Sequence, residues 1–110
     1  MLRGTRSFDA VQRTGQVRAH PLLLARFAAN GANGSRWAFA TGRRLGGAVV
    51  RNRVRRRLRH AVRDALPRIR DGWDIMLIAR PGSAAATAQE LRAAIVDLAR
   101  RGDFLKPEEE

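Results

Sequence analysis

The sequence has no cysteine among its 110 residues, and it contains a single lysine, Lys106. Without cysteine the chain can form neither disulfide bonds nor thiolate metal sites, which is compatible with the cytoplasm. No apolar run approaches the roughly 18 residues that a membrane-spanning helix needs. The first six residues are not followed by the apolar stretch of a signal peptide, so we expect a cytoplasmic location.

Acidic residues are also scarce, because 10 aspartates and glutamates stand against 22 lysines and arginines and leave a net charge of +12. A protein with this excess repels itself, and the usual compensation is a polyanionic partner. No amphipathic helix has the aromatic-rich apolar face that would favour a membrane surface. The choice of arginine over lysine mainly reflects a GC-rich genome, but arginine also binds phosphate bidentately and stacks on bases, which suits RNA.

The acidic and histidine residues do not form a pattern typical of a catalytic site. The acidic residues are spread along the chain, without the clustering of a metal-dependent nuclease. His20 and His60 are far apart in the sequence, so no two-histidine acid–base site is evident. We therefore expect no catalytic residue and no metal site in the protein alone.

The first part of the chain predicts one helix and two strands. Ser7 can cap a short helix over residues 7–14, which Gly15 can end. Residues 22–27 are typical of one strand and residues 36–41 of another, and two Asn-Gly pairs between them favour a turn. We expect these two strands to pair as a hairpin.

The second part predicts a loop, two helices and one more strand. Glycine and arginine dominate residues 42–47, and we expect a helix over residues 48–66, stopped by the proline that follows. Residues 73–79 form a nearly continuous apolar run, which indicates a buried strand. Thr87 and Glu90 have the spacing of a capping box before a final helix with apolar residues on one face.

These elements place the chain in the α+β class, with a small sheet covered by helices. We expect a single domain over residues 1–101. Residues 102–110 end in three glutamates. Such a segment is typical of a disordered tail, and we expect one here.

The helix expected over residues 48–66 has two contrasting sides at 100° per residue. The apolar side collects Val54, Leu58, Ala61, Val62 and Ala65. The opposite side collects Asn52, Arg53, Arg56, Arg59, His60 and Arg63. The apolar side can dock on the sheet while the other presents a row of guanidinium groups, and Arg55 and Arg57 lie at the boundary.

The charges of the basic side have one sign as far as Asp64. Like charges at i, i+3 and i+4 destabilise an isolated helix by a few tenths of a kcal/mol per pair. Phosphates would compensate them by releasing condensed counterions. The alternative is an ordinary solvated face, but such faces usually mix both signs. Arg43 and Arg44 add to the same surface, because they precede two glycines and a helix start, where N–H groups bind anions.

Residues 48–59, with Arg-Asn-Arg at their centre, resemble the signature segment of the bacterial ribonuclease P protein family. Residues 43–46 resemble the basic pair and glycine that lead into that segment. Residues 7–11 resemble the N-terminal helix of the family and residues 73–80 its last strand. The resemblance covers roughly residues 5–100, and the four pieces occur in the family's order.

The resemblance implies an α-β-β-β-α-β-α fold, with a small mixed sheet, related to a domain of ribosomal proteins. It also implies a left-handed β-α-β crossover around the signature helix, whereas the general rule would predict a right-handed one. The sequence pattern shows three clear strands. We expect the additional strand near residues 36–44.

The resemblance also implies two RNA-binding surfaces. The signature helix and its preceding loop would contact an RNA subunit through Arg43, Arg44, Arg51, Asn52, Arg53, Arg55, Arg56 and Arg59, with His60 and Arg63 on the same side. A cleft between the first helix and the sheet would hold the 5′ leader of precursor tRNA with Phe8, Gln12, Leu22, Leu24 and Arg26.

Aromatic residues in that cleft stack on bases in the family, worth about 1–3 kcal/mol each. Phe8 matches one of them, although it can equally be an anchor between helix and sheet. Gln12 replaces a second one, and the chain has no tyrosine. Trp37 and Phe39 lie two apart on a strand and so share a face, where we expect them in the core rather than as platforms for bases.

The function implied is that of the protein subunit of ribonuclease P, a tRNA 5′-maturation endoribonuclease. Its partners would be the catalytic RNA and precursor tRNA, with no obligatory protein partner. The protein alone would bind no cofactor, and the RNA subunit would bind Mg²⁺ and activate water. The alternatives are a ribosomal or other structural RNA-binding protein and a DNA-binding module, which the nearly uniform arginine face disfavours.

Overall fold

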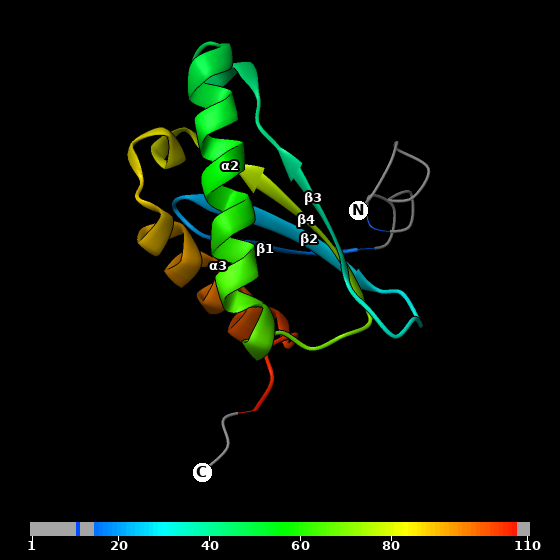
Figure 1. Cartoon of the computed structure of the whole chain (residues 1–110). Coiled ribbons are helices and arrows are strands. Elements are labelled where there is room, and N and C mark those ends of the chain that lie inside the picture. The colour runs from blue at the N-terminus through cyan, green and yellow to red at the C-terminus, as the bar shows by residue number, and fades with distance from the viewer. Residues whose placement is uncertain (1–10, 12–14, 108–110) are drawn as a thin grey trace.

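The computed structural model describes residue 11 and residues 15–107. The described elements form one sheet with two α-helices and three short 3-10 helices (Figure 1). The strands are β1 Gln16–Ala19, β2 Leu23–Ala29, β3 Arg36–Ala40 and β4 Trp73–Ala79. The helices are η2 Arg43–Leu45, α2 Ala48–Ala65, η3 Leu66–Arg68, η4 Pro81–Ala85 and α3 Ala88–Gly102.

The helix predicted over residues 7–14 lies outside the described residues, apart from Val11. Val11 has helical conformation and is fully buried, and its carbonyl accepts a hydrogen bond from the Gly15 N–H at 3.0 Å. The predictions for α2 and α3 are confirmed within a residue or two, as is the α+β class. Within the described residues, neither helix is long and apolar enough to span a membrane.

The strand order β1-β2-β4-β3 shows that the predicted hairpin is wrong. β2 pairs antiparallel with β4, and β3 pairs parallel with β4, so the last strand of the chain lies between the two that were expected to meet. β4 is the most continuously apolar strand, and a central position covers it on both edges. The Asn-Gly segment over residues 30–35 therefore crosses the end of β4 instead of closing a hairpin.

The additional strand also lies elsewhere than predicted. It is β1, which pairs antiparallel with β2 from Gln16↔Phe27 to Ala19↔Leu24. Residues 41 and 42 instead leave the sheet and lead into η2. β1 is short, largely exposed and without apolar alternation, because backbone pairing with the edge of β2 rather than side-chain burial defines it.

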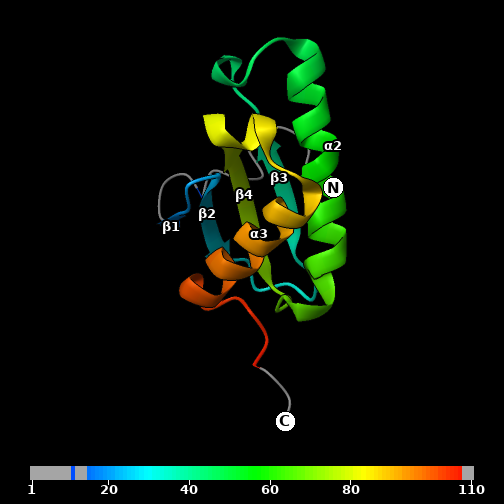
Figure 2. The ribbon, with the colours of Figure 1, turned by 90° about the vertical axis from the view of Figure 1, so that its left-hand side faces the viewer.

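The β3–α2–β4 unit crosses over with the left hand that the resemblance implies. In Figure 1, α2 lies in front of the sheet, β3 and β4 both run upward, and β4 lies to the left of β3. Figure 2, turned by 90°, shows α2 clearly to one side of the sheet. This hand is opposite to that of nearly all such crossovers.

Both α-helices cover the same face of the sheet and pack against each other (Figure 2). From β2, Leu23, Ala25 and Phe27 are buried in the shared core, and β4 contributes Ile75 and Leu77. Each fully buried leucine, isoleucine or phenylalanine side chain stabilises the fold by about 1.5–3 kcal/mol. The alternate residues of these strands face the other side of the sheet.

The C-terminal segment is more ordered than the sequence predicts. Gly102 is the last residue of α3, Phe104 is buried against Phe27, and Leu105 forms a bridge with Ile69. The prediction of a disordered tail from residue 102 is therefore wrong for residues 102–107, because one apolar side chain, Phe104, fills the core beside Phe27. Residues 108–110 lie outside the described part.

Candidate nucleic-acid interface

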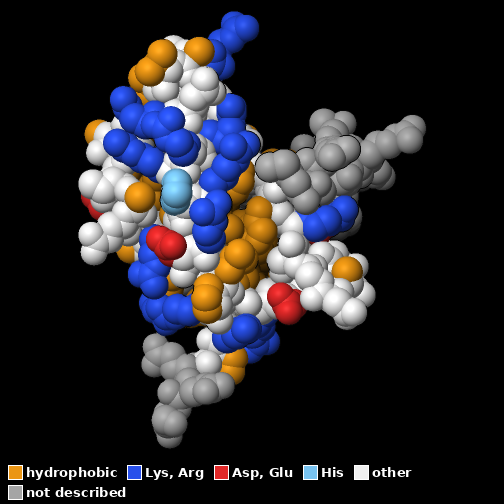
Figure 3. Space-filling model, in the orientation of Figure 1, with side chains coloured by type: hydrophobic (Ala, Val, Ile, Leu, Met, Phe, Trp, Pro, Cys, Tyr) orange, Lys and Arg blue, Asp and Glu red, His pale blue; other side chains and the backbone are white. Residues whose placement is uncertain are grey.

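Helix α2 has the two sides that its sequence predicts, except that Arg53, expected on the basic side, is half-buried at its boundary. Its buried residues are Val54, Leu58, Ala61, Val62 and Ala65, as expected. Its exposed face carries Asn52, Arg56, Arg59, His60 and Arg63. Figure 3 shows the result as a row of blue side chains along the helix, with one histidine among them. Because the apolar side of α2 packs on the sheet, the basic side faces solvent.

No arginine of α2 forms an ion pair within the part of the chain that the structure describes. The two ion pairs found there join Arg36 to Asp74 and Arg101 to Asp97. Asp64, near the end of α2, is the one acidic residue of the helix. Ion pairs among the described residues therefore leave the positive field of this face unneutralised, and it favours association with polyanions.

Three arginines at the boundary of the basic side are held by hydrogen bonds to the protein. Arg53 donates to the Ala84 carbonyl at 3.3 Å and Arg57 to the Ala86 carbonyl at 2.8 Å. Arg55 donates to the Thr41 hydroxyl at 2.6 Å and to the Asn52 side chain at 3.2 Å. These bonds orient the guanidinium groups without neutralising them, since each acceptor is uncharged.

The signature arginines also retain unused donors. The Nε atoms of Arg51 and Arg53 are buried and have no hydrogen-bond partner among the described residues. A buried donor without a partner costs free energy, about 1–3 kcal/mol for a typical group. Because both Nε atoms are closed to solvent, they show how closely these two side chains are packed and are not themselves open to an external acceptor.

The segment before α2 extends the basic surface. Arg43 and Arg44 are exposed on η2, and Gly47 caps α2 without a side-chain hydrogen bond. The first-turn N–H groups of α2 are therefore free of a side-chain cap, in the arrangement that binds anions. Gly46 makes the turn, because its φ of 135° is one that other residues rarely adopt.

The residues predicted for the leader cleft do not all lie together. Leu24 and Arg26 face the side of the sheet opposite α2 and α3, opposite Ile78 and Met76 of β4. Leu22, at the bend before β2, packs against the core instead, next to Gly82. Phe8 and Gln12 lie outside the described residues. Of the residues predicted for the cleft, Leu24 and Arg26 thus share this face with Met76 and Ile78, and the Arg36–Asp74 pair lies further along the same face.

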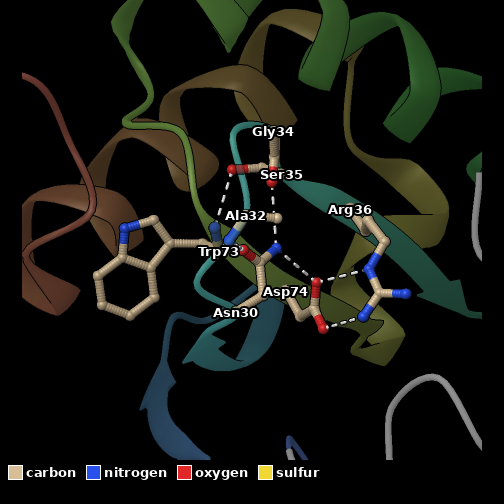
Figure 4. Close-up of polar contacts among 7 residues, drawn as sticks. All are labelled: Asn30, Ala32, Gly34, Ser35, Arg36, Trp73 and Asp74. Atoms are coloured by element: carbon tan, nitrogen blue, oxygen red, sulfur yellow. Dashed lines mark hydrogen bonds and ion pairs between the residues drawn. The ribbon is translucent and has the colours of Figure 1, made fainter.

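An ion-pair network that the sequence did not reveal joins the beginnings of β3 and β4. Arg36 donates from Nε to Asp74 Oδ1 at 2.8 Å and also from Nη2 to Oδ2, and Asn30 Nδ2 donates to Oδ1 at 2.9 Å (Figure 4). The Arg36 guanidinium, aided by Asn30, lowers the pKa of Asp74 against the opposing effect of burial. Only the parallel register Arg36↔Asp74 could have indicated this pair.

Ser35 completes the network on its loop side (Figure 4). Its hydroxyl accepts from the Trp73 N–H at 3.1 Å and donates to the Arg70 carbonyl at 3.1 Å. The side chain of Asn30 accepts from the Ala32 N–H at 2.7 Å. These bonds fasten the loop between β2 and β3 to the start of β4, so we assign the network to stability rather than to RNA contact.

A small basic α+β fold whose helix α2 carries a row of arginines without ion pairs among the described residues belongs to the class of RNA-binding proteins. Comparison with known proteins specifies it further. The family model of ribonuclease P matches residues 1–102. The ribonuclease P protein component of Roseiflexus sp. (strain RS-1) is 41% identical over 106 residues, which are 96% of this chain and 87% of that protein.

Solved structures agree with this result. The ribonuclease P protein of Thermotoga maritima superposes with a TM-score of 0.82 at 26% identity, over 91% of this chain and 94% of the other. That of Staphylococcus aureus gives a TM-score of 0.83 at 19% identity over 96% of both chains, which shows the shared fold. The chain belongs to the bacterial ribonuclease P protein family. It is a partner of the RNA subunit in the enzyme that matures the 5′ end of tRNA, in which the RNA carries the chemistry.

Proposed function

We propose that the basic face of α2, together with η2, forms the contact with the RNA subunit of ribonuclease P. The observation that carries this proposal is the row of arginines without ion-pair partners in the described structure. Each arginine that meets a phosphate releases condensed counterions, so binding becomes strong at low salt and falls as salt rises.

The residues of this face would contribute to RNA binding in different ways. Arg56, Arg59, His60 and Arg63 are exposed and can move to follow a phosphate backbone. Arg53 and Arg55 are held by the protein and are pre-oriented, which lowers the entropy lost on binding. Asn52, whose amide can bond a base edge or the backbone, lies among them and bonds to Arg55.

The opposite face of the sheet would bind the leader of precursor tRNA. Leu24, Ile78 and Met76 offer an apolar surface to unstacked bases, and Arg26 lies beside Met76 where it can meet a phosphate. Mature tRNA has no leader and would gain nothing from this surface. The protein would therefore raise the affinity for precursor over mature tRNA.

Magnesium ions belong, in this proposal, to the RNA-containing holoenzyme. Among the described residues no three histidine, aspartate or glutamate side chains cluster into a metal site. The contribution of the protein would be binding and charge compensation: it adds contacts to the leader and screens the repulsion between two RNA molecules. We place this function in one unit that includes the packed C-terminal segment through Lys106.

Reconstitution with a bacterial ribonuclease P RNA at low Mg²⁺ tests the proposal. Adding the protein should raise the rate of 5′ maturation of a precursor tRNA. Replacing Arg56 and Arg59 by alanine should weaken binding to the RNA at least about tenfold, because each loses charge-assisted hydrogen bonds. These two residues are preferable to Arg53, whose bond to Ala84 also supports the fold.

The matched control replaces Arg92 and Arg100 of α3 by alanine, which removes the same charge from another helix. Equal losses in the two double variants would mean that net charge alone, and not the α2 face, binds the RNA. A protein that binds structured RNA but leaves precursor-tRNA cleavage unchanged would instead have the role of a structural RNA-binding protein.

A further inference from the structure

A groove lies between α2 and the edge of the sheet formed by β3. Its volume is about 270 Å³. It is lined by Ser35, Arg36, Trp37, Phe39, Arg59, Val62, Arg63 and Leu66. β3 is the last strand in the order of the described sheet, so no further described strand covers this side. Figure 3 shows hydrophobic side chains exposed there, directly beside the arginine row of α2.

The walls of this α2–β3 groove are apolar and its rim is basic. Trp37 and Phe39 pack against the core as predicted, yet both also line the groove. Leu66, just after α2, is 45% exposed at the groove, one of three large hydrophobic side chains with such exposure in the described part. Arg59 and Arg63 extend from the exposed side of α2 onto the same rim.

We propose that the α2–β3 groove binds one unstacked base of the RNA that α2 contacts, with the adjoining phosphates on Arg59 and Arg63. The inference rests on the proposed function and goes beyond it, because it adds a base pocket to a phosphate-binding face. Base stacking on aromatic side chains tolerates any base, so the pocket would favour single-stranded or bulged nucleotides without reading their sequence.

Two observations favour a nucleotide as the occupant. The rim is positive, which complements the phosphates on either side of a base. The volume is just below the range of about 300–1,000 Å³ that is typical of ligand pockets, which suits one small planar group.

A second copy of the chain fits the groove less well. In a symmetric pair the rim of Arg59 and Arg63 would approach an equally basic surface, and like charges at an interface are unfavourable. A nucleotide brings the opposite charge together with a flat apolar surface.

Fluorescence of Trp37 provides the first test. Trp73→Phe keeps an aromatic ring beside Phe27 and Phe104 and leaves Trp37 as the sole tryptophan. Titration of this variant with a bacterial ribonuclease P RNA should quench the emission of Trp37 and protect it from acrylamide. If filter binding shows a saturated complex while both signals stay unchanged, the groove does not hold a base.

Substitutions at the groove provide the second test. Trp37→Leu keeps an apolar wall but removes the stacking ring, and it should weaken RNA binding at least about fivefold. Leu66→Gln changes an exposed side chain, so this variant should fold even if Trp37→Leu does not. Leu66→Gln should weaken RNA binding by about threefold or more. Val17→Gln on β1, also exposed, is the matched control and should leave affinity for this RNA unchanged.

The salt dependence separates this inference from the proposed function. Leu66→Gln should lower the affinity at every salt concentration without changing the slope of log affinity against log salt, because every phosphate-binding arginine is retained. Salt-steep binding that Leu66→Gln and Trp37→Leu leave intact would overturn the groove alone. A wild-type chain that ignores the RNA would overturn both proposals, and self-association that Leu66→Gln abolishes would assign the groove to a second copy.

Discussion

Asp74→Asn should destabilise the fold while leaving the RNA-binding face intact. The carboxylate of Asp74 is 8% exposed and accepts hydrogen bonds from Arg36 and from Asn30, so the substitution removes one charge from a network that is partly closed to water. Asparagine keeps the size of the side chain but offers only one oxygen and turns an NH₂ group toward donors.

The exposure of Arg36 determines how much unfolding free energy Asp74→Asn should cost. Removing one member of a buried pair costs about 3–5 kcal/mol, because the other charge stays buried. The Arg36 side chain is 46% exposed, so water can solvate its guanidinium once Asp74 is neutral. We therefore expect a loss of about 1–3 kcal/mol, close to the range for a hydrogen-bonded group that loses a charged partner.

The pH dependence gives an independent check on the same network. The pKa of Asp74 is lowered in the folded state, so the native protein binds fewer protons than the unfolded chain. Its contribution is present above the unfolded-state value near 3.9, and it is lost as the pH falls through the lower folded-state value. The wild type should therefore lose stability below about pH 4 more steeply than Asp74→Asn does.

Urea unfolding followed by circular dichroism measures both effects, and Asp97→Asn is the control. Asp97 forms an exposed pair with Arg101 four residues along α3, and such pairs contribute less than about 0.5 kcal/mol. Equal stabilities of Asp74→Asn and Asp97→Asn at pH 7 would refute the role given to the network. So would a loss of RNA affinity in Asp74→Asn under conditions where it is folded.

Three further predictions concern other positions. Gly46→Ala should cost about 1–3 kcal/mol in urea unfolding, because φ is 135° there and a β-carbon would lie 3.2 Å from the Val50 side chain; a neutral effect would show that the turn can relax. Thr87→Ala should cost about 1 kcal/mol by loss of the cap on the Glu90 N–H, and it should not alter RNA binding at temperatures where the protein is folded. Phe8→Ala should weaken binding of the holoenzyme to precursor tRNA by about five- to a hundredfold and leave mature tRNA unaffected, whereas equal losses for both would exclude Phe8 from the leader cleft.

Local patterns predicted the elements that carry strong local signals. The stripe of Val54, Leu58 and Val62 specified both the extent of α2 and the side it buries. Thr87 and Glu90 form the capping box that their spacing predicted, with Thr87 as the N-cap and Glu90 in the first turn of α3. Both features depend on residues that are close together in the sequence, so the local sequence is enough to predict these helices.

Pairing between distant segments could not be predicted in the same way. β1 has little apolar alternation, and it exists because the backbone of β2 offers an open edge. The place of β4 between β2 and β3 depends on burying its apolar run on both edges, which competes with the local turn signal of the Asn-Gly loop. The left-handed crossover followed only from the family resemblance, since the general rule gives the opposite hand.

The candidate site likewise contains residues that local periodicity predicted and residues whose positions depend on the tertiary fold. The exposed residues of α2 followed from helical periodicity, and the structure places Asn52, Arg56 and Arg59 on one side. Leu22 packs into the core apart from Leu24 and Arg26, because the bend before β2 breaks the strand alternation. The groove beside β3 was not expected, since Trp37 and Phe39 were assigned to the core without knowing that β3 ends the sheet.

The salt dependence of affinity for the RNA subunit tests the central claim most directly. The account predicts a steep linear fall of log affinity with log salt for the wild type. For Arg56→Ala/Arg59→Ala it predicts a slope smaller by roughly 0.7–0.9 for each phosphate that the variant no longer neutralises. The control Arg92→Ala/Arg100→Ala should keep the wild-type slope. A shallow wild-type dependence, or identical slopes for all three proteins, would contradict the assignment of the arginine face of α2 to RNA phosphates.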